Sequence, residues 1–436
     1  MTLPLHGVRV LDLTNVIAGP LASYQLVMLG AEVIKIEVPG RGDLARKMGS
    51  DPKMGEVNMG ASFCANNAGK KSITLNLKEA RGREVFKRLL ADADVVLENF
   101  RPGVMQKLGL GYEALKAIKP SIIFCAVSGF GQKGPLSQRP SYDQIIQGFS
   151  GLMSVTGDED SAPLRAGFVV CDTMAAMTAA FAICAALFRR ERSGEGEMID
   201  VSMLDSSLST MAAWSISNYL NAGKVPAPMG NENITASPSG TFKTASGPLN
   251  VVNNEQSQYH TLCDVIGMPE RKTDARFADR NERIARRYEL KPIIEERLKT
   301  RSAEEWEKLF DQAGVPAGPI LSIPQVMAHP HVEYRKLIKR FENVAGVGKA
   351  ISVPRAGFML ASGQPDVDRP PPTLGEDTEI VYKCTDHYAP ACDGAVRWDS
   401  CGIDWPWAGE PVLSARDAAA PILAAFTSPF VWEAAP

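Results

Sequence analysis

Histidine is scarce in this chain of 436 residues, and the five histidines lie at positions 6, 260, 329, 331 and 387. None falls between Ile17 and Asn250, where most of the candidate site residues lie. A Ser-His-Asp arrangement therefore cannot be assembled from local sequence signals. His329 and His331 have no further nearby ligands, which makes a metal pair improbable. We expect no metal site.

The eight cysteines include no C-x-x-C pair, which argues against a zinc site and against a secreted disulfide framework. The N-terminus shows no secretory signal. The longest nearly uncharged stretch, 173–188, is shorter than the roughly 20 residues that span a bilayer. We expect a buried helix there, no membrane partner and a cytoplasmic location.

Charge of either sign is not in large excess: 47 Lys and Arg face 50 Asp and Glu, a net charge of -3. This balance does not indicate a nucleic-acid partner, and a polyanionic small ligand would need local cations. Apolar residues make up 45% and charged residues 22%, as in globular proteins. The length predicts two or three domains.

Apolar, strand-like runs alternate with helical periods through the first half of the chain. The predicted strands are 8–13, 33–37, 72–77, 94–97, 121–127 and 198–203. The predicted helices are 21–29, 78–92, 104–118, 173–188 and 204–222. Strands joined by crossover helices predict a parallel, doubly wound α/β sheet, whose ligands bind at the carboxyl ends of the strands.

The composition changes at 223–237, where Gly, Pro and Asn mark a linker. A hairpin is predicted at 240–252 and amphipathic helix at 258–311, and a strand at 351–360 returns to the first domain. The predicted large domain is therefore 1–222 with 324–382, and the small domain is 223–323. Residues 383–436 are a different kind of sequence and form an atypical tail.

The loop at 14–20 has the position of a dinucleotide-binding loop but lacks G-x-G-x-x-G, so a conventional NAD site is disfavoured. Asp172 precedes the long apolar helix. The commoner role for an Asp there is helix capping. A poorly hydrated carboxylate at a helix start also suits a nucleophile, and the two interpretations are compatible.

A second set of candidates follows strand ends or opens helices. Tyr142 and Asp143 read most simply as a loop with a helix start, but they could orient a substrate acid or tune Asp172. Lys78, Arg101 and Lys107 are individually typical of solvated surface. Together, beside Asn99 and Phe100, they could bind the phosphates and adenine of a nucleotide.

Several segments resemble family III CoA-transferases of the formyl-CoA transferase, or CaiB/BaiF, type. They are LPLHGVRVLDLTNVIAGPLASYQLVMLGAEVIKIE, KKSITLNLK, DVVLENFRPGVMQKLGLGYEAL, SYDQIIQGFSGLMSVTG, CDTMAAMTAAFAICAALFRRERSGEGEMIDVSM and GVPAGPI. The likeness covers about residues 3–382 in order, which makes it highly specific for the family.

The resemblance implies an acyl-CoA:carboxylate CoA-transferase that forms an interlocked homodimer, with a Rossmann-like large domain and a smaller α+β domain. It places the nucleophilic aspartate on Asp172, which would form an acyl anhydride and then a CoA thioester. Backbone amides at the helix start would stabilise the oxyanions. Coenzyme A is implied as a substrate, with no further cofactor. The implied CoA contacts are Val16, Ile17, Ala18, Leu75 to Lys78, Asn99, Phe100, Arg101, Lys107 and Pro140 to Asp143.

Three departures from the family pattern limit the carry-over. Val38-Pro39 stands where some members have a basic residue, so Arg41 is the candidate substitute. Lys107 is arginine in some relatives and lacks its bidentate fork. The small domain has Asn253-Asn254-Glu255-Gln256 where the oxalate enzymes carry a run of glycines, so oxalate is not the expected acceptor.

Two alternatives remain open from the sequence. An α-methylacyl-CoA racemase needs paired acid and base groups, but Tyr142 and Asp143 stand where racemase-like members place a histidine. A catalytically silent CoA-binding protein is the other alternative, because the tail replaces the family's final helical segment. The tail itself resembles the end of dTDP-4-dehydrorhamnose 3,5-epimerases without their catalytic histidine region. We interpret it as a fusion remnant without epimerase activity.

Overall fold

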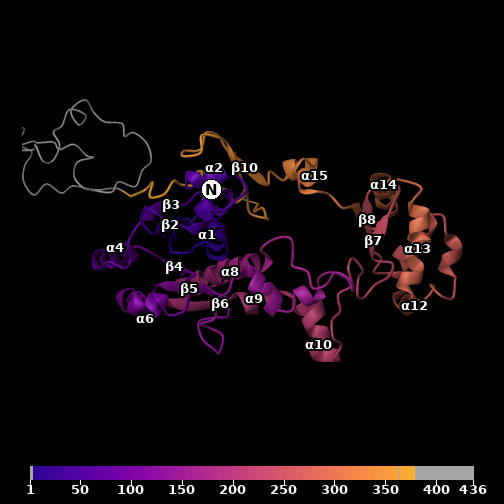
Figure 1. Cartoon of the computed structure of the whole chain (residues 1–436), viewed down its shortest axis with the longest axis horizontal. Helices are drawn as coiled ribbons and strands as arrows, with labels where there is room; N and C mark the ends of the chain where they lie inside the picture. Colours follow the sequence, from indigo (N-terminus) through magenta and orange to yellow (C-terminus); the bar gives the residue numbers. More distant parts are fainter. Residues whose placement is uncertain (1–2, 362, 379–436) are drawn as a thin grey trace, which may run out of the picture.

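The computed structural model describes residues 3–361 and 363–378, so the tail at 383–436 lies outside the described residues. A six-stranded parallel sheet forms the centre of the large body (Figure 1). Its strands are β1 (Arg9–Asp12), β2 (Glu32–Glu37), β3 (Lys71–Thr74), β4 (Val95–Glu98), β5 (Ile123–Ser128) and β6 (Glu197–Ser202). The strand order is β3-β2-β1-β4-β5-β6, and all neighbouring strands are parallel. The predicted doubly wound sheet is confirmed, and its order reverses between β1 and β4.

Alternate side chains of each strand point to opposite faces, so each face of the sheet has its own helices and its own apolar core. On one face, Val10, Leu97 and Cys125 pack with α1 (Ala18–Met28) and α8 (Val170–Ser193). On the other face, Leu11 and Phe124 pack with α4 (Ala80–Leu90) and α6 (Tyr112–Ile118). The central strands are therefore covered on both faces, as in other parallel sheets.

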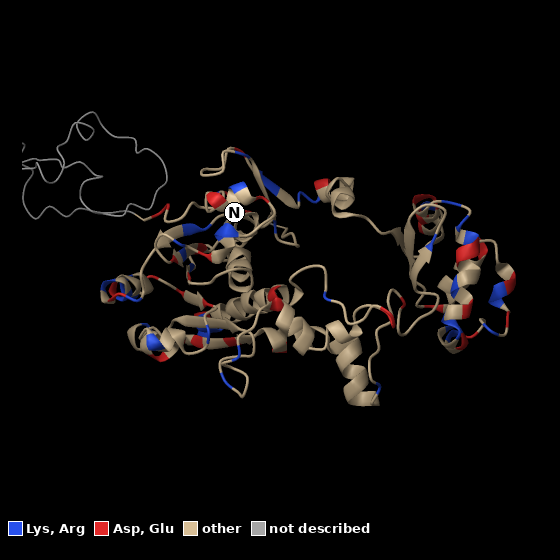
Figure 2. Cartoon of the chain, viewed as in Figure 1, with Lys and Arg blue, Asp and Glu red and all other residues tan. Residues whose placement is uncertain are grey.

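Helix α8 is long and apolar enough to cross a membrane by length and composition alone. One of its faces is instead rich in alanines, including Ala175, Ala176 and Ala179, that are fully buried in the core shared with α1. Small side chains let two helices approach closely. Figure 2 shows that charged residues are sparse along the buried part of this helix. The sequence predicted a buried helix here, and this face of α8 is buried in the core.

Shorter helices complete the large body. They are α2 (Pro52–Glu56), α3 (Ala61–Asn67), α5 (Val104–Lys107), α7 (Asp143–Phe149), α9 (Met203–Thr210) and α10 (Ser217–Ala222), with single turns at η1 (Leu44–Lys47), η2 (Met153–Val155) and η3 (Ala212–Ile216). Two predictions were wrong in detail. The helix predicted at 104–118 is divided because Gly109 has a φ of 69°, a left-handed conformation that ends α5. The helix predicted at 173–188 begins earlier, because α8 already starts at Val170 and includes Asp172.

A second body has its own sheet and its own core. Its elements are β7 (Gly240–Lys243), β8 (Pro248–Val251), α11 (Gln256–Val265), η4 (Pro269–Lys272), α12 (Arg280–Ala285), α13 (Arg287–Leu298), α14 (Ala303–Ala313) and β9 (Ala317–Pro319). The three strands are antiparallel, and β7 and β8 form the predicted hairpin. Phe242, Leu262, Phe277 and Phe310 are buried in the core between this sheet and the helices.

Two connections join the large body to the second body, and Figure 1 shows them running apart from each other. One runs through α10 and 223–239, and the other through α15 (Ile323–Met327) and α16 (Pro330–Tyr334). The second leads to an antiparallel pair, β10 (Ile338–Phe341) and β11 (Ile351–Pro354). The strand predicted at 351–360 is therefore shorter, and it does not join the parallel sheet. It contacts the large body through the Tyr24 hydroxyl, which donates to the Pro354 carbonyl at 2.8 Å.

Candidate active site

A cavity of about 250 Å³ opens at the carboxyl ends of β1, β4, β5 and β6. This is the edge where α/β sheets bind ligands, beside the point where the strand order reverses. The residues that line it are Asn15, Val16, Ile17, Ala18, Asn99, Phe100, Val127, Ser128, Gly129, Ser141, Tyr142, Asp172 and Met203. Seven predicted site residues therefore come together here: Val16, Ile17, Ala18, Asn99, Phe100, Tyr142 and Asp172.

Asp172 is the carboxyl group of this cavity. It is the third residue of α8, and the N-cap of that helix is Val169, so the capping interpretation of Asp172 was wrong. Burial, followed by the nearby Asp143 carboxylate, raises the pKa of Asp172 to about 7. Among the described residues, no Lys or Arg forms an ion pair with it. The group is therefore a weakly solvated carboxyl that titrates near neutral pH.

Asp143 lies behind Asp172 rather than in the cavity, and it is almost fully buried. Its Oδ1 accepts the backbone N–H groups of Cys171 at 2.8 Å and Asp172 at 3.3 Å, and its Oδ2 accepts from Gln147 Nε2. Asp143 thus holds the first turn of α8 and raises the pKa of Asp172. It tunes the candidate nucleophile, one of the two roles that the sequence suggested.

The helix-start amides are already used. Val170 N–H donates to the Phe168 carbonyl, Cys171 and Asp172 donate to Asp143, and Thr173 donates to the Val169 carbonyl. These donors are directed within the protein, so the expectation that they stabilise an oxyanion was wrong.

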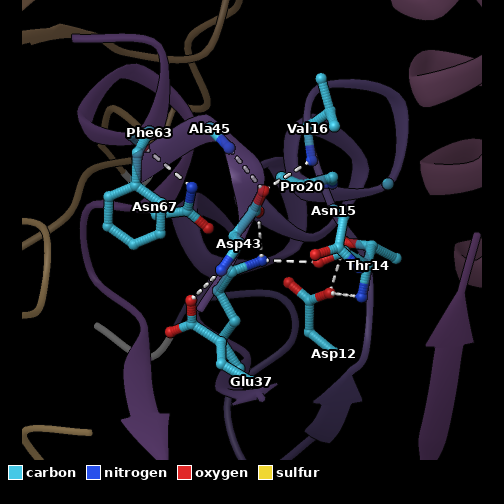
Figure 3. Close-up of polar contacts among 12 residues, drawn as sticks. Asp12, Thr14, Asn15, Val16, Pro20, Glu37, Asp43, Ala45, Phe63 and Asn67 are labelled. Atoms are coloured by element: carbon cyan, nitrogen blue, oxygen red, sulfur yellow. Dashed lines mark hydrogen bonds and ion pairs between the residues drawn. The ribbon is translucent and has the colours of Figure 1, made fainter. Parts of the chain in front are cut away.

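The loop after β1 presents Val16 to the cavity in a strained conformation. Val16 has a φ of 70°, a region that β-branched residues rarely occupy. Its N–H donates to Asp43 Oδ1 at 2.9 Å, and the same oxygen accepts from Ala45 N–H at 2.8 Å (Figure 3). The neighbouring Asn15 is clamped by Asn99, whose amide side chain accepts from Asn15 N–H and donates to its carbonyl, each at 2.8 Å.

A buried ionic cluster, formed by Asp12, Lys35, Glu37, Asp43, Arg46 and Lys70, lies beneath this loop. Lys35 Nζ lies 2.9 Å from Asp43 Oδ2 and donates to the Thr14 carbonyl at 2.7 Å. Lys70 pairs with Asp12 at 3.0 Å and Arg46 with Glu37 at 2.7 Å. Burial alone would raise the pKa of Asp12, but Lys70 and Lys35 hold it well below its usual range. Sequence reasoning missed this cluster, although charged residues inside the apolar strands β1 and β2 were a signal.

The remaining predicted CoA contacts do not line this cavity. Arg41, Lys78, Arg101 and Lys107 are exposed on the surface, and Leu75 is half-buried against the core that contains Phe86. They are free to meet a long ligand that extends beyond the cavity, and their role in binding CoA stays a prediction.

Glu98, at the end of β4, was not singled out from the sequence. It is almost fully buried, and its Oε2 accepts the Phe100 N–H at 2.7 Å. Burial raises the pKa of Glu98 to about 8, and Asp200 adds to that shift. The Glu98 side chain is therefore mainly a neutral acid at neutral pH. Its hydrogen bond holds Phe100, which lines the cavity.

Comparison with known proteins shows which family has this arrangement. Residues 5–378 match the profile of CoA-transferase family III. The chain belongs to this family. The family III chain is 37% identical over 380 residues to succinyl-CoA:glutarate CoA-transferase of Homo sapiens, covering 87% of this chain and 85% of that protein. It is 39% identical over 355 residues to acetyl-CoA:oxalate CoA-transferase of Acetobacter aceti, covering 80% and 89%.

A comparison with a solved structure points to the same family as the two relatives. The crystal structure of a CAIB/BAIF family protein from Brucella suis superposes with a TM-score of 0.75 at 36% identity, covering 86% of this family III chain and 97% of that one. Residues 372–425 match the profile of dTDP-4-dehydrorhamnose 3,5-epimerase, so the double resemblance of the sequence is confirmed. Within the described part of the chain, no group of three His, Cys, Asp or Glu is placed to hold a metal ion.

Proposed function

We propose that this family III CoA-transferase moves coenzyme A from an acyl-CoA donor to a small dicarboxylic acid, with Asp172 as the nucleophile. The observation that carries the proposal is the position of Asp172: a partly buried carboxyl without a cationic partner among the described residues, lining the cavity at the strand ends. Buried carboxyl groups with strongly raised pKa values are typical of functional sites.

The proposed reaction consists of four acyl transfers. One Asp172 oxygen attacks the thioester carbon of the donor, a C–O bond forms, the C–S bond breaks, and CoA leaves as the thiolate. The thiolate then attacks the Asp172 carbonyl carbon of the anhydride, which releases the donor acid and leaves an aspartyl-CoA thioester. The acceptor carboxylate attacks the carbon of that thioester and expels the thiolate, which leaves a second anhydride between Asp172 and the acceptor. The thiolate then attacks the acceptor acyl carbon of this anhydride, so the new CoA ester forms and the Asp172 carboxylate is released. Each step is simpler than direct exchange between two acids.

Burial of Asp172 supports this role in two ways. A poorly hydrated carboxylate needs little desolvation before it attacks. A pKa of about 7 still leaves a large ionised fraction at neutral pH. No step is an oxidation or a reduction, so the proposal needs no cofactor beyond coenzyme A itself. We expect the enzyme in the cytoplasm.

The strained loop after β1 is the proposed binding edge for coenzyme A. Val16, Ile17 and Ala18 line one wall of the cavity, and Asn99 and Phe100 line the adjacent wall. The exposed cations Arg41, Lys78, Arg101 and Lys107 would meet the phosphates outside, where a lysine acts as a point charge. Tyr142, which is 71% exposed, is at the cavity mouth and is available to a substrate.

The acceptor class rests on the relatives. Both curated relatives have a dicarboxylic acid, glutarate or oxalate, in their names. Asn253-Asn254-Glu255-Gln256, which replaces the glycine run of the oxalate enzymes, favours a longer acid than oxalate. We therefore propose a four- or five-carbon dicarboxylate as acceptor.

We further propose an interlocked homodimer, with large domain 1–222 and 324–382 and small domain 223–323. Large apolar side chains are exposed along α8 and both connections: Phe181 is 76%, Val225 75%, Ile323 74% and Tyr334 80% exposed. Such a spread of apolar surface is typical of a large permanent interface. Light scattering at micromolar concentration should give twice the chain mass, and a monomer would contradict this assembly.

A donor-by-acceptor panel tests the proposed function. Succinyl-CoA is incubated with glutarate and oxalate, and acetyl-CoA with succinate, glutarate and oxalate, and the new CoA esters are identified by mass spectrometry. We expect exchange with succinate and glutarate and little with oxalate. Solvent deuterium appearing at the α-carbon without exchange of acids would indicate a racemase. Binding of CoA without any new ester would indicate a silent binding protein.

A further inference from the structure

Ser128 has a hydroxyl group that the fold buries but does not use. It is the last residue of β5, only 9% exposed, and it lines the same cavity as Asp172. Its Oγ is shielded from bulk solvent and has no hydrogen-bond partner among the residues that the structure describes. Leaving such a group unpaired destabilises the folded state, because the hydroxyl has lost its bonds to water. A hydroxyl kept at this cost in a ligand cavity points to a partner that the substrate provides.

Several other polar groups around the cavity are already engaged, and the Ser141 hydroxyl is only half-buried. The Asn99 side chain donates and accepts within its clamp on Asn15. The Val16 N–H is bonded to Asp43, and the first four amides of α8 are bonded within the protein. Tyr142 is mainly exposed at the mouth. Ser128 is therefore the buried side-chain donor of the cavity whose bonding capacity is open.

The backbone beside Ser128 is held closely enough to aim the hydroxyl. A Cβ on Gly129 would lie 1.7 Å from Ser141 Oγ, so only glycine permits this approach of the two segments. The Gly129 carbonyl also accepts the Leu204 N–H at 3.0 Å, which ties the end of β5 to the start of α9. A donor fixed in this way needs little reorganisation during reaction, which is what transition-state stabilisation requires.

We propose that the Ser128 hydroxyl donates a hydrogen bond to the oxygen of the acyl carbon under attack beside Asp172, and strengthens it as that oxygen becomes an oxyanion. The inference rests on the proposed function and adds a catalytic residue to it. The bond is made to the tetrahedral species of both acyl-transfer halves, because donor and acceptor acyl groups occupy the same cavity in turn.

Ser128→Ala tests the inference through kcat, KM and thermal stability. We expect kcat to fall about 10²-fold, the usual loss for one oxyanion donor, with the KM for acyl-CoA changed less than threefold. The melting temperature should stay equal or rise, since an unpaired buried hydroxyl is removed. Ser128→Thr, which keeps the hydroxyl, should recover at least a tenth of the wild-type kcat. Ser150→Ala, at a buried serine that does not line the cavity, is the matched control and should lose less than twofold.

A kcat within twofold of wild type for Ser128→Ala would overturn the inference, as would a loss accompanied by a lower melting temperature and no recovery in Ser128→Thr. The proposed function fails separately: in that case the wild type forms no new CoA ester, or Asp172→Ala remains active. Asp172→Ala is therefore assayed in parallel.

Discussion

Fully buried carboxylates lie beneath the loop at 14–18 and the partly buried Asp172 lies in the cavity, and the protein treats the two in opposite ways. In the ionic cluster beneath the loop, Asp12 and Glu37 are paired with lysine and arginine, and their pKa values are lowered despite burial. In the cavity, Asp172 has only another carboxylate nearby, and its pKa is raised. The first group holds the loop in place, and the second is left reactive.

The comparison explains how a fold can carry an unstable group. An unpaired buried carboxyl destabilises the folded state when it ionises, so its surroundings must be over-determined. Asp143 fixes the helix start from behind, and the cluster fixes the opposite wall through Asp43. Removing a member of each group should therefore have opposite consequences for activity and stability.

The largest expected effect is on activity. Asp172→Ala should lower the rate of CoA transfer at least 10⁴-fold, because no other cavity carboxyl can form the anhydride. The folded state should persist, since Asp172 caps nothing and makes no ion pair. Steady-state transfer and circular dichroism measure the two parts. Residual activity above one per cent in folded enzyme would show that Asp172 is not the nucleophile.

The next largest effect is on stability. Asp43→Ala should lower the free energy of unfolding by about 3 to 4 kcal/mol, because Lys35 would lose a buried partner and two N–H groups their acceptor. Urea denaturation measures it. Glu84→Ala, which removes the exposed pair with Arg88, is the control and should cost less than about 0.5 kcal/mol.

The same variant should weaken substrate binding through Val16. If Asp43 acts by holding Val16 at positive φ, then Val16→Gly should reduce the loss, because glycine adopts that conformation without strain. We expect the KM for acyl-CoA to rise about tenfold in Asp43→Ala relative to the wild type. In the Val16→Gly background, adding Asp43→Ala should raise the KM less than threefold. Additive losses would show that Asp43 acts only on the stability of the fold.

A smaller effect is expected on the pH dependence of stability through Asp172. A raised pKa means that the folded state favours the neutral acid, so the wild type loses stability as pH rises from about 4 through 7. Asp172→Asn stays neutral and should be more stable than wild type by about 2 kcal/mol at pH 8, but equally stable at pH 4. Urea melts at both values measure it. Lower stability of the variant at pH 8 would mean that the carboxylate is favourably paired.

The smallest effect is expected at Glu98. Glu98→Gln should change CoA transfer less than twofold at pH 6.5, because a neutral acid and an amide both accept the Phe100 N–H. As pH rises from about 4.5 to 8, the wild type should lose stability relative to the variant. Glu98→Ala is the contrast: it leaves that N–H without its acceptor, and should be less stable than Glu98→Gln.

The sequence predicted what depends on periodicity and order along the chain. The alternation of strands and helices predicted the parallel sheet with its ligands at the carboxyl ends of the strands, and the family resemblance named Val16, Asn99 and Asp172 as site residues. It did not predict the contacts made across the fold. Lys35 reaches the Thr14 carbonyl because β2 lies beside β1, and Asp143 reaches Cys171 because α7 packs against the start of α8.

The same limit explains what was misjudged in the site. The amides at the start of α8 looked free because a helix start usually has free donors, and the acceptor that occupies them is 28 residues away from Cys171 in the chain. Ser128 was part of a glycine-rich run, and only the folded structure shows that its hydroxyl is buried without a partner. Whether a buried hydroxyl finds a hydrogen-bond partner depends on the folded structure, and the local sequence does not show it.

Oxygen transfer into Asp172 tests the central claim most directly. The enzyme is incubated with unlabelled succinyl-CoA and glutarate carrying ¹⁸O in its carboxylates, then digested, and the peptide that contains Asp172 is weighed by mass spectrometry. The proposed steps replace one oxygen of the aspartate by an acceptor oxygen in each complete turnover, so the peptide should gain 2 Da after one turnover and approach 4 Da after many, with the label on Asp172. Turnover that produces glutaryl-CoA while this peptide keeps its natural mass would contradict the account.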